Sequence, residues 1–199
     1  PQVGSVLSRV HVVFESDATA PTLVCTAAEG SADLTRLQER MVQALLIMDR
    51  VEFDEPLPWT DLELFDWFAR SIDGIRVEDV EYSSCCDATG YMSVKSSGLA
   101  AVDTERWIDP SNGAGLSDLV GLLVHEARHN EDKPHTCDGG NDATVAEMGA
   151  WAVQAFLFQW FAQHLDQSFF ATTDPWPGYY TEQMLFAAEQ TLSGRICEQ

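Results

Sequence analysis

Two histidines four positions apart, His125 and His129, are the residues of this sequence best suited to bind a metal ion. On a helix, residues i and i+4 project from the same face, so both imidazoles can reach one ion. Neutral imidazole is a natural ligand of Zn²⁺, with each nitrogen about 2.0–2.1 Å from the metal. Glu126 directly follows the first histidine, and it can take a proton from water activated by the ion and pass it to a leaving group. This pattern predicts a site for one zinc ion per chain with hydrolytic chemistry.

A catalytic zinc site usually takes three protein ligands and leaves one position for water, so a third ligand is needed. Several residues of the sequence could supply it. His135 lies only ten residues after His125, so the loop that returns it to the ion costs little chain entropy. Glu147, on a downstream segment that we expect to be helical, is the alternative. Asp138 and Asp142 are further candidates. We favour His135 as the third ligand.

Residues 125–135, HEARHNEDKPH, resemble the metzincin pattern H-E-x-x-H-x-x-G-x-x-H of the zincin metallopeptidases. The chain departs from that pattern at Asp132, where the family has the glycine that turns the chain toward the third histidine. Aspartate can also adopt the left-handed conformation, although less readily than glycine. In the gluzincins a glutamate from a later helix completes the site, which would select Glu147. A metzincin Met-turn would have to come from Met148 or Met184.

The resemblance implies a zinc-dependent endopeptidase that acts on a peptide or protein, with Glu126 as the general base. It also implies a small sheet packed on the active-site helix, with residues 91–95 or 99–108 as an edge strand that binds extended substrate. Tyr179 and Tyr180 are ordinary surface tyrosines in one interpretation and oxyanion donors in another. Two other functions stay open: a catalytically weak zincin-like domain that binds a peptide or partner, and a zinc amide hydrolase that does not act on peptides.

The hydrophobic pattern predicts an α+β fold, with strands early in the chain and long helices late. We expect one zincin-like domain over residues 1–199, with strands and two helices in 1–110 and the motif helix and C-terminal helices in 111–199. Strands are expected at residues 3–14, 75–82, 91–95 and 99–108, and helices at about 32–48, 61–73, 118–130, 144–166 and 181–192.

The net charge of −21 argues against nucleic-acid binding, which needs a basic surface. Only two lysines stand against 32 acidic residues, a composition that suits a salty medium and is compatible with a cationic substrate. No run of 18 apolar residues occurs, so we expect no membrane span.

Five cysteines without a C-x-x-C pair predict disulfides more than a zinc ribbon. The start at Pro1, with neither Met nor a leader, is what removal of a secretory signal would leave, so we expect a secreted protein with two disulfides and one odd thiol. Cys85 and Cys86 are expected to bond different partners, because a ring between adjacent cysteines is strained.

Several polar residues near the motif have weaker signals. Arg128 is expected to pair with Asp142 or Glu147 and so to join the late helices. Asp138, Asn141 and Asp142 could hold a structural calcium ion, although their spacing is not that of an EF-hand. The isolated histidines His11 and His164 are expected to be structural.

Overall fold

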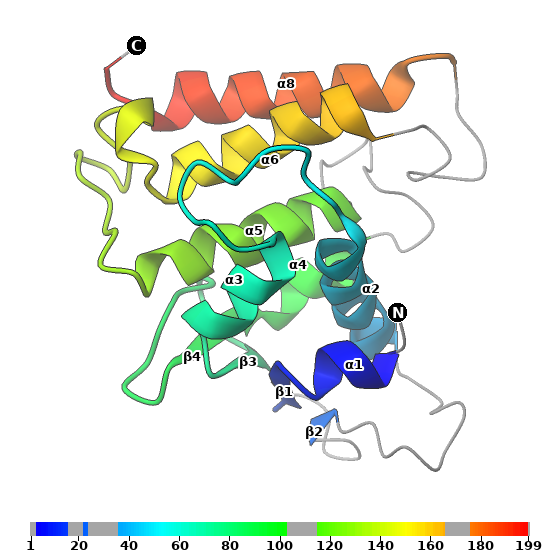
Figure 1. The fold of residues 1–199 in the computed structure, drawn as a ribbon. Helices are drawn as coiled ribbons and strands as arrows, with labels where there is room; N and C mark the ends of the chain where they lie inside the picture. Colours follow the sequence, from blue (N-terminus) through cyan, green and yellow to red (C-terminus); the bar gives the residue numbers. More distant parts are fainter. Residues whose placement is uncertain (1–2, 16–21, 24–35, 103–114, 166–175, 199) are drawn as a thin grey trace. The chain divides into compact units, whose positions relative to one another are not determined.

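The computed structural model describes residues 3–15, 22–23, 36–102, 115–165 and 176–198 (Figure 1). The chain divides into two compact units, residues 1–102 and 103–199, close to the boundary expected after residue 110. In the described residues the first unit combines strands with short helices, and the second consists mainly of helices. This mixture confirms the α+β class, whereas a single zincin-like domain stays a prediction.

The strands of the first unit form a small mixed sheet, as expected, and their order is β2-β1-β3-β4. Its members are β1 (His11–Phe14), β2 (Thr22–Leu23), β3 (Gly74–Glu78) and β4 (Tyr91–Lys95). β2 pairs antiparallel with β1, whereas β1, β3 and β4 are mutually parallel. Packing of this sheet on the motif helix stays a prediction.

One face of the sheet carries the apolar core of the first unit. Because side chains alternate along a strand, every second residue of the three parallel strands points to this face. The register places these residues in two rows, and all of them are buried: Val12, Ile75, Met92 and Phe14, Val77, Val94.

On the other face, Gly74 separates two polar residues of the neighbouring strands. A Cβ atom at Gly74 would come within 2.5 Å of the Tyr91 ring and 2.6 Å of the His11 carbonyl oxygen. The missing side chain lets the His11 imidazole and the Tyr91 hydroxyl meet in a hydrogen bond above the middle strand. His11 is therefore structural, as expected.

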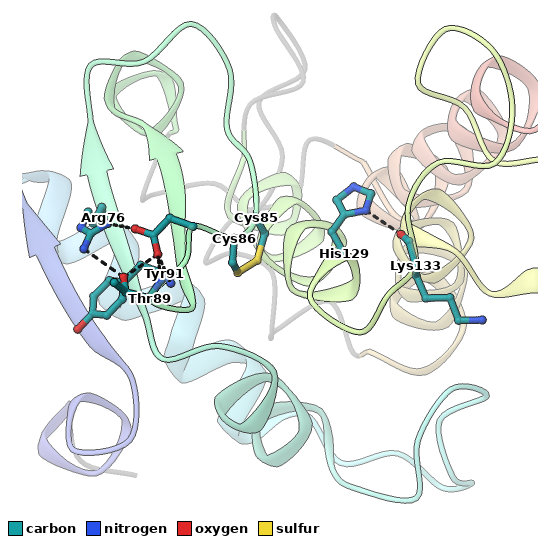
Figure 2. Close-up of a disulfide and its surroundings, with 8 residues drawn as sticks. Arg76, Cys85, Cys86, Thr89, Tyr91, His129 and Lys133 are labelled. Carbon is teal, nitrogen blue, oxygen red and sulfur yellow. Dashed lines mark hydrogen bonds and ion pairs between the residues drawn. A yellow bond between two sulfur atoms is a disulfide. The ribbon is translucent and has the colours of Figure 1, made fainter.

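The outer edge of β4 is already occupied by the segment 83–87 (Figure 2). The backbone N–H groups of Ser84 and Ser93 each donate to the other residue's carbonyl, at 2.9 and 2.8 Å, and the N–H of Asp87 donates to the Tyr91 carbonyl at 3.0 Å. A peptide can add to a sheet only where backbone groups are unpaired. The expectation that 91–95 pairs with substrate is therefore wrong for this edge.

The same segment contains a disulfide between the adjacent residues Cys85 and Cys86 (Figure 2). The expectation that they bond different partners is wrong, because Ser84 and Asp87 on either side hold both cysteines together beside β4. A second disulfide joins Cys137 and Cys197. Cys25 lies outside the described residues.

The helices of the first unit are α1 (Val3–Leu7), α2 (Arg36–Arg50), α3 (Leu64–Ser71) and α4 (Ser96–Ala101). The strand expected over 3–14 begins only at His11, because α1 precedes it and buries Val6. The strand expected over 99–108 is wrong at its start, where the chain is helical to Ala101, and the rest lies outside the described residues.

The second unit contains α5 (Leu116–His129), the 3₁₀ turn η1 (Val145–Glu147), α6 (Ala150–His164) and α8 (Tyr179–Arg195). α6 lies between α5 and α8 (Figure 1). Its buried side chains lie on several faces, as a helix with neighbours on both sides requires. Gly121 of α5 permits close packing, since a Cβ there would come within 2.9 Å of the Phe158 ring.

Two helix boundaries differ from the expectation. The helix expected from residue 144 is interrupted at Met148, which has a left-handed backbone with φ of 47°, and it resumes only at Ala150. Gly194 lies inside α8 and does not end it. Tyr179 and Tyr180 are buried, so the interpretation as surface tyrosines is wrong. None of the described helices is long and apolar enough to cross a membrane.

Candidate metal centre

Three histidines of the second unit converge on one point. α5 presents His125 and His129 one helical turn apart, and the loop that follows brings back His135. The ring centroids lie 5.0, 5.3 and 4.6 Å apart for the pairs 125–129, 125–135 and 129–135. One nitrogen of each ring lies within 4.8 Å of those of the other two. These side chains are the three that the sequence predicted as ligands.

The loop to His135 turns at Asp132, which has a left-handed backbone with φ of 56°. This residue occupies the position of the metzincin glycine, and it makes the turn that aspartate was expected to make there. A hydrogen bond joins His129 Nδ1 and the Lys133 carbonyl oxygen at 2.8 Å (Figure 2). The turn thus returns the chain and also fixes the orientation of the second histidine.

A further hydrogen bond orients the His135 ring. His135 Nδ1 lies 2.9 Å from Asp142 Oδ1. His125 Nδ1 and Gln154 Oε1 are both buried without a well-formed hydrogen bond, yet Gln154 is close enough to His125 to oppose the lowering of its pKa. With Nδ1 of His129 and His135 directed at an acceptor, Nε2 remains as the ligand atom of these two rings, the usual arrangement around zinc-binding histidines.

The electrostatics keep the first two histidines in the form that binds metal. Burial lowers the pKa of His125 to about 3, and the neighbouring His129 and His135 lower it further in the same direction. Burial also lowers the pKa of His129. Both rings are therefore neutral at pH 7 and offer a lone pair. Three imidazoles form a donor set that suits zinc and leaves a position for water.

Asp142 connects the centre to the start of α6. Its carboxylate is almost fully buried, and its second oxygen, Oδ2, accepts a hydrogen bond from the Trp151 backbone N–H at 2.9 Å. A carboxylate at a helix N-terminus is favourable. Because one oxygen serves His135 and the other serves α6, Asp142 supports a ligand and is not itself a candidate ligand. The expected calcium site of Asp138, Asn141 and Asp142 has no support from this arrangement.

Glu147, the alternative third ligand, lies outside the group of three histidines. It is exposed in η1, and its Oε2 accepts a hydrogen bond from Thr136 Oγ1 at 2.6 Å. The break at Met148 turns this residue away from α6, so the helix-borne position expected of a gluzincin glutamate is absent here. Met184 is buried on α8.

Arg128 pairs with Glu131 of its own turn, and its Nε donates to the Met148 carbonyl at 2.8 Å. The expected partners Asp142 and Glu147 are therefore wrong. The expected structural role is nevertheless present, because the second bond ties α5 to the residues just before α6.

Glu126, the predicted base, is buried on α5 between the two helix ligands. Trp151 is a neighbour that the sequence analysis did not identify as part of the site. Its indole lies 4.0 Å from the His125 ring and 5.8 Å from the His135 ring, nearly parallel to the latter. Gln154 lies one turn further along α6. Trp151 and Gln154 are three residues apart and therefore share one face of α6, which is the signal that the sequence offered. Nothing in the sequence indicated that this face lies against α5.

The loop that carries His135 is fastened to the residues after α8. The disulfide Cys137–Cys197 joins them, with Cα atoms 6.7 Å apart. The Asp142 N–H donates to the Arg195 carbonyl at 3.0 Å, and the Cys197 N–H donates to the Asp142 carbonyl at 3.0 Å. The third histidine and its supporting carboxylate therefore depend on residues about 60 positions later.

In comparisons with known proteins, no family model, curated protein or solved structure matches this chain.

Proposed function

We propose that the chain is a zinc-dependent endopeptidase of the zincin type. The observation that carries this proposal is the convergence of His125, His129 and His135, with Glu126 next to the first of them. The outer hydrogen bonds of His129 and His135 support it, because a chance cluster has no reason to orient two of its rings in this way.

In the proposed reaction the three histidines hold the metal through Nε2. When bound, zinc supplies a Lewis acid that polarises the substrate carbonyl and lowers the pKa of water. Glu126 accepts the proton of the attacking water and delivers it to the leaving amine. Asp142 and the Lys133 carbonyl keep two of the imidazoles in place. The net charge of −21 supports a substrate with cationic side chains, and the disulfides support an extracellular location.

Metal content and peptide cleavage test the proposal together. Protein purified without chelator is expected to contain about one zinc ion per chain and to cleave casein or a peptide library. Both properties should disappear with a chelator and return when zinc is added. Zinc without peptide cleavage would favour a zincin-like binding domain or a hydrolase of other amides, and protein without a stoichiometric transition metal would overturn the proposal.

Glu126→Gln tests the base, because glutamine keeps the size of the side chain but cannot accept the proton. We expect full zinc content and turnover lowered by at least about a hundredfold, the usual scale for a general acid–base group. Glu189→Gln, at an exposed position on α8, is the matched control and should retain parental turnover. Normal hydrolysis by Glu126→Gln would contradict the assignment.

A further inference from the structure

Arg195 places a positive charge beside the histidine cluster. The residue lies in the last turn of α8, and its guanidinium carbon lies 4.6 Å from the centre of the Trp151 ring. The same indole is in edge contact with His125. One aromatic ring therefore separates the guanidinium from the nearest predicted ligand.

This cation has no acidic partner among the described residues, although the chain contains 32 acidic residues. Arg128, the other described arginine of the unit, is paired with Glu131. The backbone of Arg195 is nevertheless fixed, since its carbonyl accepts the hydrogen bond of the Asp142 N–H. The fold thus holds a cation next to the centre and leaves its guanidinium available.

A cation near a metal dication is unfavourable unless an anion lies with them. A guanidinium presents a planar pair of donors that fits a carboxylate. The guanidinium carbon lies 4.6 Å from the Trp151 ring centre, and that ring lies 4.0 Å from the His125 ring. One extended residue spans about 3.3–3.6 Å, so two or three residues of a peptide are long enough to extend from the histidine cluster to Arg195.

We propose that Arg195 binds the free C-terminal carboxylate of the substrate, so that the peptide is cut close to its carboxyl end. This inference rests on the zinc-peptidase chemistry of the proposed function, but it replaces cleavage of internal bonds by cleavage near the carboxyl terminus. Trp151 would form the wall along which the last residues lie.

Binding to an inert protein tests the inference without relying on turnover. The zinc-loaded Glu126→Gln variant is titrated by calorimetry with two peptides of one sequence, one ending in a free carboxylate and the other in an amide. We expect the free acid to bind at least tenfold more tightly. Adding Arg195→Ala should abolish that preference, and adding Arg195→Lys should restore part of it. Arg70→Ala, exposed in the last turn of α3, is the matched control and should keep the preference.

The outcomes separate this inference from the proposed function. Equal binding of the acid and the amide to the protein that retains Arg195 would overturn the carboxylate site, while cleavage of either peptide by the parent would leave the peptidase proposal intact. Equal weakening of both peptides by Arg195→Ala, with zinc content unchanged, would assign Arg195 a purely structural role and also overturn the inference. If the parent binds no zinc, the proposed function fails first.

Discussion

Asp132 illustrates how one backbone conformation brings His135 to the other two histidines. A non-glycine residue with positive φ costs roughly 1 kcal/mol, and a β-branched residue costs more. We therefore expect Asp132→Gly to retain zinc and to raise the free energy of unfolding by up to about 1 kcal/mol. Asp132→Val should lower both the stability and the zinc affinity. Thermal unfolding and competitive zinc titration measure these effects, and unchanged zinc affinity in Asp132→Val would show that the turn does not place His135.

A pair of alanine variants tests which residue is the third ligand. His135→Ala should weaken zinc binding strongly, because two histidines hold this ion poorly. Glu147→Ala should retain zinc, because its carboxylate bonds Thr136 outside the cluster. Affinities measured with a chromophoric chelator distinguish the two. Parental affinity in His135→Ala with loss in Glu147→Ala would identify a site of the gluzincin type.

The sequence predicted the site residues that are close to one another along the chain. It did not predict the role of residues that reach the site from more distant positions. His125, His129 and His135 lie within eleven positions, so helical geometry and a short loop were enough to group them. Asp142, later in the same loop, supports His135, and Trp151 of α6 lies against the rings of His125 and His135. Their contacts depend on how α6 packs against α5, which no local pattern specifies.

α5 is held at its start by Asp118, whose Oδ2 accepts a hydrogen bond from the Gly115 N–H at 2.9 Å. Burial nevertheless raises the pKa of Asp118 to about 6. A raised pKa means that the folded state prefers the neutral acid. The stability associated with this group is complete below its unfolded pKa of about 3.9 and is lost as the pH rises through 6.

Asp118→Asn should therefore stabilise the protein at pH 8, because asparagine keeps an acceptor for Gly115 but carries no buried charge. We expect a gain of about 1–3 kcal/mol in the free energy of unfolding at pH 8, and the gain should fade between pH 6 and 4. Chemical denaturation of both proteins across this range measures it. A gain of the same size at pH 4 would rule out charge burial as its cause.

Among the elements, the sequence predicted α5 and β4 most closely, since apolar spacing or β-propensity marks each of them clearly. The prediction failed where a helix begins inside a segment whose whole sequence favours helix. Residues 144–166 have a continuous helical pattern, but Asp142 bonds the N–H of Trp151 and so fixes the N-terminus of α6 at Ala150. That choice depends on a tertiary contact and could not be predicted from propensity alone.

For the molecule as a whole, the disulfide Cys137–Cys197 is the largest covalent constraint among the described residues. It spans 60 positions, and the chain-entropy relation assigns a loop of that length about 4 kcal/mol. Cys197→Ser should lower the free energy of unfolding by about that amount and also weaken zinc binding, because Cys137 lies two residues from His135. The disulfide between the adjacent residues Cys85 and Cys86 closes almost no loop. The double variant Cys85→Ser, Cys86→Ser is therefore the control and should change the free energy of unfolding far less. Denaturation and zinc titration without reductant test both variants.

The attachment of the loop to residues 195–198 also has a consequence for the order of events during biosynthesis. A ribosome delivers α5, with His125 and His129, well before it delivers Arg195 and Cys197. At a synthesis rate of about 5–20 residues per second, the loop that carries His135 waits several seconds for the segment that fastens it. A nascent chain therefore holds two ligands without a fixed third. On the proposed function, the chain would therefore lack a complete metal centre until residues 195–198 have been made.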